Sequence, residues 1–377
     1  MNWTRRLYSQ TLPPDLYGAL VIMPNGLSGA SLKIAAAKID FSARLETALT
    51  CVPGLIFLGA LVGLAFLLRT FSVFAILSPM ILATILGMLF RNIAEVPAWT
   101  KPGIAFGLRR LLRLGIVLLG LQLGASQIVQ VGLSGVVIIA IVVASTFAFT
   151  KWLGARLAVD EKLAELIGAG TSICGASAII ATNTVTRGAD EDVTYAMACI
   201  TVLGSCAMFI YPLLAISLHL SPERFGLWAG SSIHEVAQVI GAAFQDGPEA
   251  GQAGTVAKLT RVMMLAPFVM TLGFIGSLRS RKGEALERNA PPVPWFLLGF
   301  LFFVILNSFI VIPASFMTVI VAITTILLSM ALAAMGLETD FRKLQLKGFR
   351  PFCLAVASWL FIASVSLALL EVTALLE

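Results

Sequence analysis

The sequence is poor in charged residues. Its 377 residues include 26 Lys and Arg and 20 Asp and Glu, so charged residues make up 12% of the chain, about half of the fraction in a typical soluble domain. Hydrophobic residues make up 58%, and the mean hydropathy is +0.95. A soluble monomer of this composition would have too little polar surface to cover its exterior. The composition excludes a soluble enzyme and indicates a membrane protein.

Further absences narrow the functional classes. The net charge is +6, but the cations lie between apolar runs and not on one exposed face, so we expect no nucleic-acid partner. The cysteines lack the paired spacing of a zinc or redox motif, so we expect no metal and no cofactor. No stretch reads Gly-x-x-x-x-Gly-Lys-Ser/Thr, so an ATP-binding loop does not supply the energy. The five cysteines, which we interpret as reduced packing residues, are Cys51, Cys174, Cys199, Cys206 and Cys353.

Long apolar runs dominate the rest of the chain. A helix needs about 20 consecutive apolar residues to cross a bilayer. The runs do not alternate between apolar and polar residues as barrel strands do, so they predict helices. The sequence predicts an all-α polytopic membrane protein with about eleven transmembrane helices in a domain spanning 51–377. The runs cover roughly 52–68, 74–90, 111–129, 134–153, 164–184, 193–217, 226–244, 254–277, 294–311, 315–336 and 351–372.

The distribution of cations predicts the orientation. Lys and Arg accumulate in cytoplasmic loops, and 22 of the 26 fall on one side of the predicted helices, together with the N-terminus. We therefore expect a multi-pass protein with its N-terminus inside. Residues 1–50 lack the continuous apolar core of a signal peptide. They predict a cytoplasmic N-terminal extension with an interfacial helix around Ala30 to Thr50.

Two segment pairs resemble each other within the chain. The stretch 169–174 (AGTSIC) recurs sixty residues later as 229–234 (AGSSIH), and 120–122 (GLQ) resembles 336–338 (GLE). Transporters are often built from inverted repeats whose broken helices meet at the bilayer midplane. We predict broken helices at Gly170, Gly175 and Gly230. Chance similarity between small-residue packing helices is the alternative, because the two pairs do not recur in the same chain order.

An acidic residue lies in the middle of one predicted span. A charge within a span costs at least about 2.5–3.5 kcal/mol, so such groups are functional candidates. Glu235 lies in the run 226–244, beside His234 and close to Ser232. We predict that Glu235, with His234, binds a coupling proton and that Ser232 contacts the substrate. The alternative is a protonated Glu235 that only joins two helices.

A second group predicts an anion site. Lys258 and Arg261 are three residues apart, so both can face one side of a helix, where they would clamp an oxyanion. The glycine-rich segment around Thr171 and Ser172 favours a half-helix that starts there and directs its N–H groups at the same anion. The alternatives are cations that reach the headgroups or pair with Glu235, and an unbroken packing helix.

Four stretches carry a resemblance to a known family: 112–125 (LRLGIVLLGLQLGA), 170–181 (GTSICGASAIIA), 232–244 (SIHEVAQVIGAAF) and 258–268 (KLTRVMMLAPF). From about residue 50 to 370, the chain resembles the sulfate exporter family of YeiH-like conserved hypothetical bacterial membrane proteins. The resemblance implies a secondary transporter of the bacterial inner membrane, with inverted repeats and crossed broken helices as in cation:proton antiporters and bile-acid symporters. Many such proteins are homodimers, but no feature of this sequence decides the subunit number.

The leading hypothesis is a secondary active transporter that exports a small anion, sulfate or a sulfonate, by alternating access. The coupling ion is H⁺ or Na⁺, with protons favoured, because a proton or sodium gradient is the remaining energy source. The alternative within transport is a sodium/proton antiporter in which Glu235 binds the cation and Lys258 balances its charge. An intramembrane serine hydrolase using Ser172 or Ser177 with His234 lacks the Gly-x-Ser-Gly motif of rhomboid proteases, and a passive channel would need rings of like charge. We therefore expect no enzyme.

Overall fold

The computed structural model describes residues 29–279, 295–310, 312–342 and 347–376. The chain divides into two compact units, 1–52 and 53–377. Helix α3 (Gly29–Leu68) begins in the first unit and ends in the second. The segment proposed as an interfacial helix, Ala30 to Thr50, is helical as part of α3, whereas residues 1–28 of the predicted extension lie outside the described residues.

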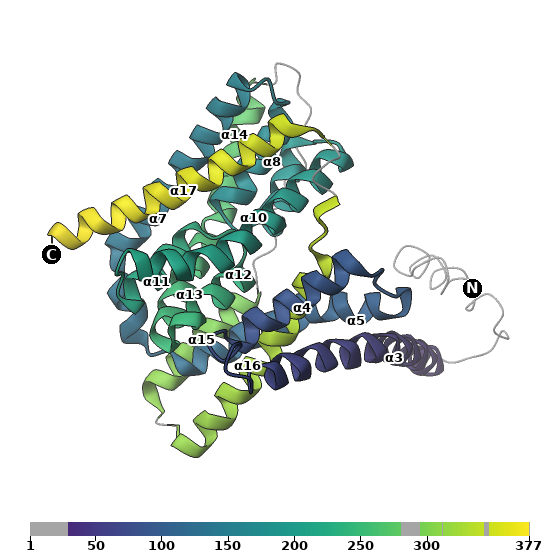
Figure 1. The fold of residues 1–377 in the computed structure, drawn as a ribbon. Helices are drawn as coiled ribbons and strands as arrows, with labels where there is room; N and C mark the ends of the chain where they lie inside the picture. Colours follow the sequence, from purple (N-terminus) through teal and green to yellow (C-terminus); the bar gives the residue numbers. More distant parts are fainter. Residues whose placement is uncertain (1–28, 280–294, 311, 343–346, 377) are drawn as a thin grey trace, which may run out of the picture. The chain divides into compact units, whose positions relative to one another are not determined.

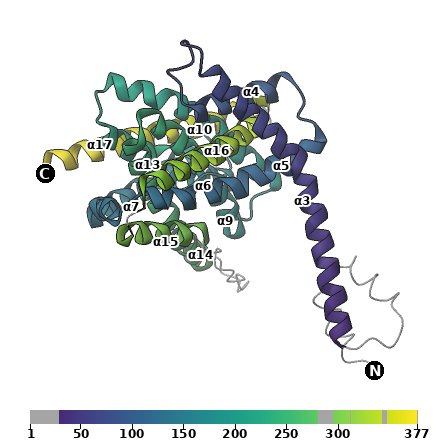
Figure 2. The ribbon, with the colours of Figure 1, turned by 90° about the horizontal axis from the view of Figure 1, so that it is seen from below.

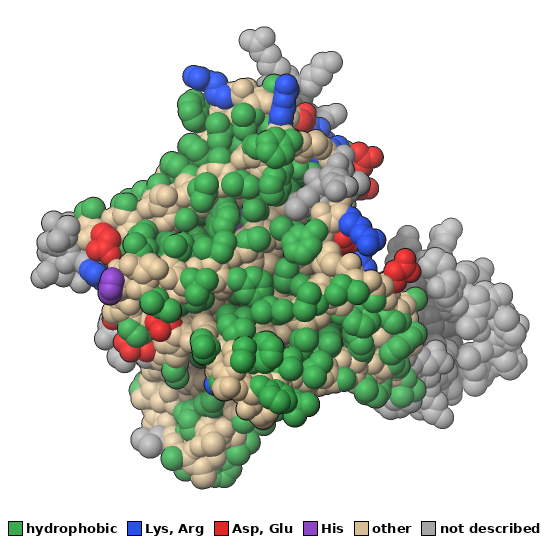
Figure 3. Space-filling view, viewed as in Figure 1, with side chains coloured by type: hydrophobic (Ala, Val, Ile, Leu, Met, Phe, Trp, Pro, Cys, Tyr) green, Lys and Arg blue, Asp and Glu red, His purple; other side chains and the backbone are tan. Residues whose placement is uncertain are grey.

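The second unit confirms the predicted fold class, because every described element is a helix. Figure 3 shows hydrophobic side chains over most of the visible face, with charged side chains gathered at its edges. Two shorter apolar helices are α4 (Pro79–Ile93) and α15 (Trp295–Phe309). Six stretches are long and apolar enough to cross a membrane: Leu49–Leu68, Gly135–Arg156, Asp190–Ser217, Pro248–Ile275, Ala314–Glu338 and Phe349–Val372.

The remaining helices of this unit are labelled in Figures 1 and 2. A π-helical turn, Gly107–Leu111, joins α5 to α6, so the chain is helical from Lys101 to Gln122. The bounds are α5 (Lys101–Phe106), α6 (Leu112–Leu119), α7 (Ala125–Arg156), α8 (Glu161–Ser172), α9 (Ala176–Thr186), α10 (Asp190–Ser217), α11 (Pro222–Ser232), α12 (Val236–Ala243), α13 (Pro248–Met263), α14 (Leu265–Arg279), α16 (Ala314–Glu338) and α17 (Phe349–Leu376).

The predicted span 164–184 is a helical hairpin and not a crossing. Helix α8 begins at its N-cap Asp160, whose carboxylate accepts the N–H groups of Lys162 and Leu163. It ends at Ser172, and α9 returns along it. At the open end, Lys162 Nζ donates to the Arg187 carbonyl at 2.9 Å, and Thr186 Oγ1 donates to Glu165 at 2.9 Å. Both ends of hairpin α8–α9 therefore lie on one side of the unit, the Lys162 side.

The predicted span 226–244 is a second hairpin, formed by α11 and α12. Both helices contact the same short stretch of α13. A Cβ atom on Gly226 would overlap the Ala250 carbonyl oxygen, and one on Gly254 would lie 3.1 Å from the Ala243 Cβ atom. The start of α11 and the end of α12 therefore lie together. Beyond α12, Gln245 Nε2 donates to the Ile76 carbonyl between α3 and α4, which defines the opposite side, the Gln245 side.

The two hairpins form a repeat whose members enter from opposite sides. Their first helices end at Ser172 and Ser232, sixty residues apart, and each break continues with isoleucine at 173 or 233. Each hairpin precedes a long helix, α10 or α13. Because α10 runs from the Lys162 side and α13 from the Gln245 side, the repeat is inverted, as the short sequence match suggested.

The hairpins correct two details of the sequence-based topology. Two of the eleven predicted spans are re-entrant, although each of the eleven runs is mainly helical. The cation count had placed Arg224, but not Arg187, on the same side as Lys162. In the structure Arg187 lies on the Lys162 side, and Arg224, which contacts Glu371 at 3.6 Å, lies on the opposite side. The error arose because a run of about 20 apolar residues has the same composition as one crossing or two half-depth helices.

Cysteine labelling tests the hairpins. With the five native cysteines replaced, we expect Glu161→Cys and Asp190→Cys to react with an impermeant maleimide from one face of the membrane, and Glu223→Cys and Asp246→Cys from the other. All four positions are exposed. Labelling is measured in right-side-out and inside-out vesicles. A result that puts Glu161→Cys and Asp190→Cys on opposite faces contradicts the hairpin α8–α9.

Candidate functional site

The two hairpin tips, Ile173–Gly175 and Ile233–Glu235, contact each other. Gly175 has a φ of +73°, a left-handed conformation that disfavours residues with a Cβ atom. A Cβ atom there would also lie 2.6 Å from Cγ of Glu235 in the other tip. The tips lie beside Lys258 and Arg261, near the middle of the candidate span Pro248–Ile275. The site is therefore deep within the unit.

Lys258 joins the two tips through its ammonium group. The side chain is fully buried, and Nζ donates to the carbonyl oxygens of Ile173 and Ile233, each at 2.8 Å. It also donates to the His234 carbonyl. An ammonium group has three donors, so all of them are engaged by backbone atoms of the two hairpin tips.

Arg261 repeats this arrangement one turn further along α13. Its buried guanidinium donates from Nη2 to the Thr171 carbonyl at 2.8 Å and from Nε to the Ser172 carbonyl at 3.2 Å. On the other hairpin, Nη1 donates to the carbonyls of Gly230 and Ile233, at 3.2 and 2.9 Å. The rigid fork of Arg suits several fixed acceptors.

The two cations complement the ends of α8 and α11. The last carbonyls of a helix have no partner in the helix and carry the negative end of its dipole. Water is absent in a bilayer core, so these groups need partners from the protein. Lys258 and Arg261 supply them, and neither forms an ion pair among the described residues. Their donors therefore contact backbone carbonyls in this structure, and the oxyanion clamp stays a prediction.

Glu235 lies at the opposite kind of helix end. It is the N-cap residue of α12, and its carboxylate accepts a hydrogen bond from the backbone N–H of Ala176, the first residue of α9. Its own N–H donates to Oε1 of Gln238 at 3.0 Å, and Gln238 Nε2 donates to the Thr201 carbonyl of α10 at 3.1 Å. The carboxylate thus faces positive helix ends, whereas the cations face negative ones.

The predicted hydroxyl ligands mostly bond to their own helices. Ser232 Oγ donates to the Trp228 carbonyl, and Ser172 Oγ lies 3.5 Å from the Ala169 carbonyl. Thr171 and Ser172 end α8, so the half-helix with free N–H groups starts at Ala176 and not near Thr171. Gly170 lies inside α8, Gly230 lies inside α11, and only Gly175 of the three lies in a break.

Two polar side chains beside the tips have no partner among the described residues. Both ring nitrogens of His234 and Oγ1 of Thr171 are buried and accept or donate no hydrogen bond there. Ser177, one residue into α9, is exposed, and Ala176 and Glu235 are half-buried. Sequence reasoning did not predict that α9 starts at Ala176, with Ser177 beside the tips. The signal in the sequence is Gly175, because glycine readily adopts a positive φ. A helix break placed at Gly175 would have made Ala176 and Ser177 the first residues of the next helix.

Aromatic residues fix the hairpin α11–α12 on its neighbours. Tyr211 of α10 stacks on Trp228 of α11, with ring centroids 4.2 Å apart and an interplanar angle of 8°. Trp359 of α17 donates from Nε1 to the Tyr211 hydroxyl at 3.2 Å, and Trp228 Nε1 donates to the Ala363 carbonyl at 2.9 Å. The rings hold α11 against α10 and α17.

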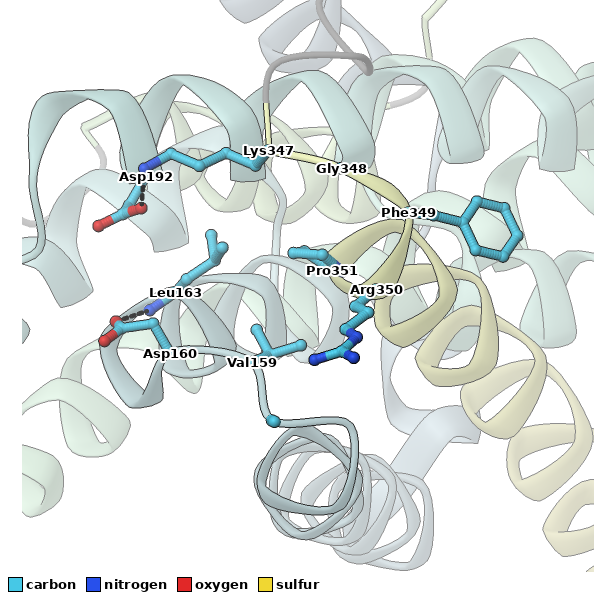
Figure 4. Close-up of a pocket in the computed structure, with 10 residues that line it drawn as sticks. Val159, Asp160, Leu163, Asp192, Lys347, Gly348, Phe349, Arg350 and Pro351 are labelled. Atoms are coloured by element: carbon cyan, nitrogen blue, oxygen red, sulfur yellow. Dashed lines mark hydrogen bonds and ion pairs between the residues drawn. The ribbon is translucent and has the colours of Figure 1, made fainter.

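A cavity of about 550 Å³ opens on the Lys162 side, away from the tips, and none of the predicted site residues lines it. Figure 4 shows Lys347 extending across it to Asp192, with Nζ 2.9 Å from the carboxylate and 3.3 Å from Glu191. The hydrogen bonds to Asp192 and Glu191 raise the pKa of Lys347. These contacts join the start of α10 to Lys347, which lies just before α17.

The fold and the paired tips define a multi-pass α-helical membrane protein with two opposed re-entrant hairpins. The family described as "Conserved hypothetical protein 698" matches residues 53–355, and the chain belongs to this family of YeiH-like membrane proteins. A UPF0324 membrane protein of Yersinia pestis is 38% identical over 335 residues, which cover 84% of this chain and 92% of the relative. The UPF0324 inner membrane protein YeiH of Salmonella typhi is 39% identical over 293 residues, covering 76% and 83%. No solved structure matches the chain.

Replacing Arg261 tests its role at the tips. Arg261→Ala leaves buried carbonyls of both hairpins without donors, and each such group costs about 1–3 kcal/mol. We expect the melting temperature of the purified protein to fall by at least roughly 5 °C. The matched control Arg224→Ala removes a partly exposed cation and should change it by about 1 °C or less. Equal melting temperatures for the two variants would refute the capping role.

A pair of glycine substitutions tests the contact between the tips. Gly175 and Gly247 both have a positive φ, of +73° and +99°, but only Gly175 has a close neighbour for a Cβ atom. Gly247→Ala adds backbone strain alone, whereas Gly175→Ala adds overlap with Glu235 that costs a further ~1–3 kcal/mol. Thermal unfolding of both variants measures the difference. Equal destabilisation would show that the tips do not touch.

Proposed function

We propose that this protein is a secondary transporter of a small anion in the bacterial inner membrane, and that it works by alternating access. The observation that carries the proposal is the contact of two hairpin tips from opposite sides near mid-depth, where buried cations outnumber the carboxylate. Transporters commonly place their substrate between inverted repeats at interrupted helices. Small shifts of one hairpin relative to the other would open the tips to either side.

The charges at the tips favour an anion. Lys258 and Arg261 contribute two formal positive charges, and Glu235 contributes one negative charge. The ends of α8 and α11 are already capped, so the anion would bind at the starts of α9 and α12. Backbone N–H groups at a helix start bind anions, and the exposed hydroxyl of Ser177 adds a donor. This site replaces the predicted ligands Thr171, Ser172 and Ser232.

Glu235 is the residue that would couple transport to protons. As a carboxylate it occupies the N–H of Ala176 and reduces the net positive charge of the site. Protonation removes that charge, so a proton and an anion would bind cooperatively. The coupling free energy between the proton and the anion is favourable, because opposite charges attract and each bound species raises the affinity for the other. His234 adds a second ionisable group, with unpartnered nitrogens, on the same tip.

Two comparisons support an anion over the antiporter alternative. A cation antiporter would use the carbonyls of the breaks as ligands, and here Lys258 occupies three of them. Sulfate or a sulfonate carries the oxygens that N–H groups and hydroxyls bind.

Counterflow in proteoliposomes tests the proposal. We expect labelled sulfate or a sulfonate from a panel of anions to exchange in a pH-dependent manner. Glu235→Gln should retain exchange but lose its pH dependence, whereas Glu223→Gln, an exposed carboxylate at the start of the same hairpin, should behave as wild type. If no anion exchanges while an imposed sodium gradient drives proton movement, the antiporter hypothesis replaces this one.

A further inference from the structure

The ammonium group of Lys258 lies in a cage of carbonyl oxygens. Two of its three acceptors, Ile233 and His234, belong to the tip of hairpin α11–α12, and the third, Ile173, belongs to the tip of hairpin α8–α9. All three are backbone oxygens from non-helical residues at the breaks. The cage is fully buried, and it is closed only when both tips are in place.

Such a cage has the chemistry of a sodium site. Hard cations take oxygen ligands, and unwound backbone carbonyls with helix C-terminal ends coordinate Na⁺ in transporters. The carbonyl oxygens here converge on one positive charge that is tethered to α13 by a four-carbon stem. Arg261 differs, because its planar fork spreads over separate acceptors and no single point lies at their centre.

Comparison of the two halves of the inverted repeat shows that only one of them carries this ammonium group. Helix α10, the long helix that follows the first hairpin, contains no Lys or Arg. Of the two long helices, α13 alone therefore supplies positive side chains to both tips. One bound monovalent cation would do the same work as the one ammonium group.

We propose that the meeting point of the tips is a monovalent-cation site which the Lys258 ammonium group fills permanently. The protein therefore needs no Na⁺ to hold its hairpins together, and removal of the ammonium group creates a site for Na⁺. This inference goes beyond the proposed function, since it concerns the ion that joins the tips and not the transported solute.

The charge around the cage is consistent with this replacement. The ionisable groups facing Lys258 are Arg261 on its own helix, Glu235 and His234 on the α11–α12 tip, and Cys174 on the α8–α9 tip. In Lys258→Ala, the charges of Arg261 and Glu235 cancel, and one Na⁺ restores the wild-type net charge. The shortened side chain also leaves the volume in which the ion can bind.

The test compares Lys258→Ala with Lys258→Met, which fills the space of the stem without a charge. Melting temperatures of the purified proteins are measured in choline chloride and in NaCl at equal ionic strength. We expect wild type and Lys258→Met to show no difference between the salts. Lys258→Ala should be less stable than wild type in choline and gain roughly 5 °C in Na⁺.

Three outcomes overturn the proposal. These are stabilisation of wild type by Na⁺ over choline, equal responses of the Ala and Met variants, and a folded Lys258→Ala that responds to none of Li⁺, Na⁺ and K⁺. If Lys258→Ala is too unstable to purify in choline, recovery of folded protein in NaCl alone supports the proposal, and failure in both salts overturns it. The readout needs no transport, so a failure here is distinct from failure of counterflow.

Discussion

The structure depends on how carbonyl groups at the ends of two interrupted helices are satisfied in a place where water is absent. Helices α8 and α11 end near mid-depth, and an unsatisfied backbone group in hydrocarbon costs several kcal/mol. The protein meets this demand with two cations from one helix. At the start of α9, the backbone N–H of Ala176 is satisfied by the negatively charged carboxylate of Glu235. Each charged side chain thus faces helix ends of the opposite sign.

This arrangement explains why three charged residues are tolerated at the hairpin tips, inside apolar segments. Lys258, Arg261 and Glu235 do not form a simple ion pair in which one charge cancels another. Partial charges of the backbone compensate them instead. Under the proposed function, the net positive charge of the three side chains favours an anion over a cation.

Much of this could be read from the sequence, and the limits have physical causes. The membrane class, the helices and the three charged residues within the spans follow from composition, because charge is rare and costly among apolar residues. The repeat was visible as AGTSI and AGSSI. The sequence could not separate a hairpin from a crossing, since both satisfy the same hydropathy. It also misassigned Thr171 and Ser172, because small residues and hydroxyls occur at either end of a half-helix, and only the backbone shows which end they occupy.

The asymmetry between α10 and α13 has a consequence for how such a protein can change over time. If the two halves arose from one duplicated segment, each could once have supported its own tip, and a lost cation in one half would have left the other intact. Because α10 contains no Lys or Arg, the two halves are not interchangeable. Lys258 and Arg261 of α13 now serve both tips, so a change at either position affects both halves at once.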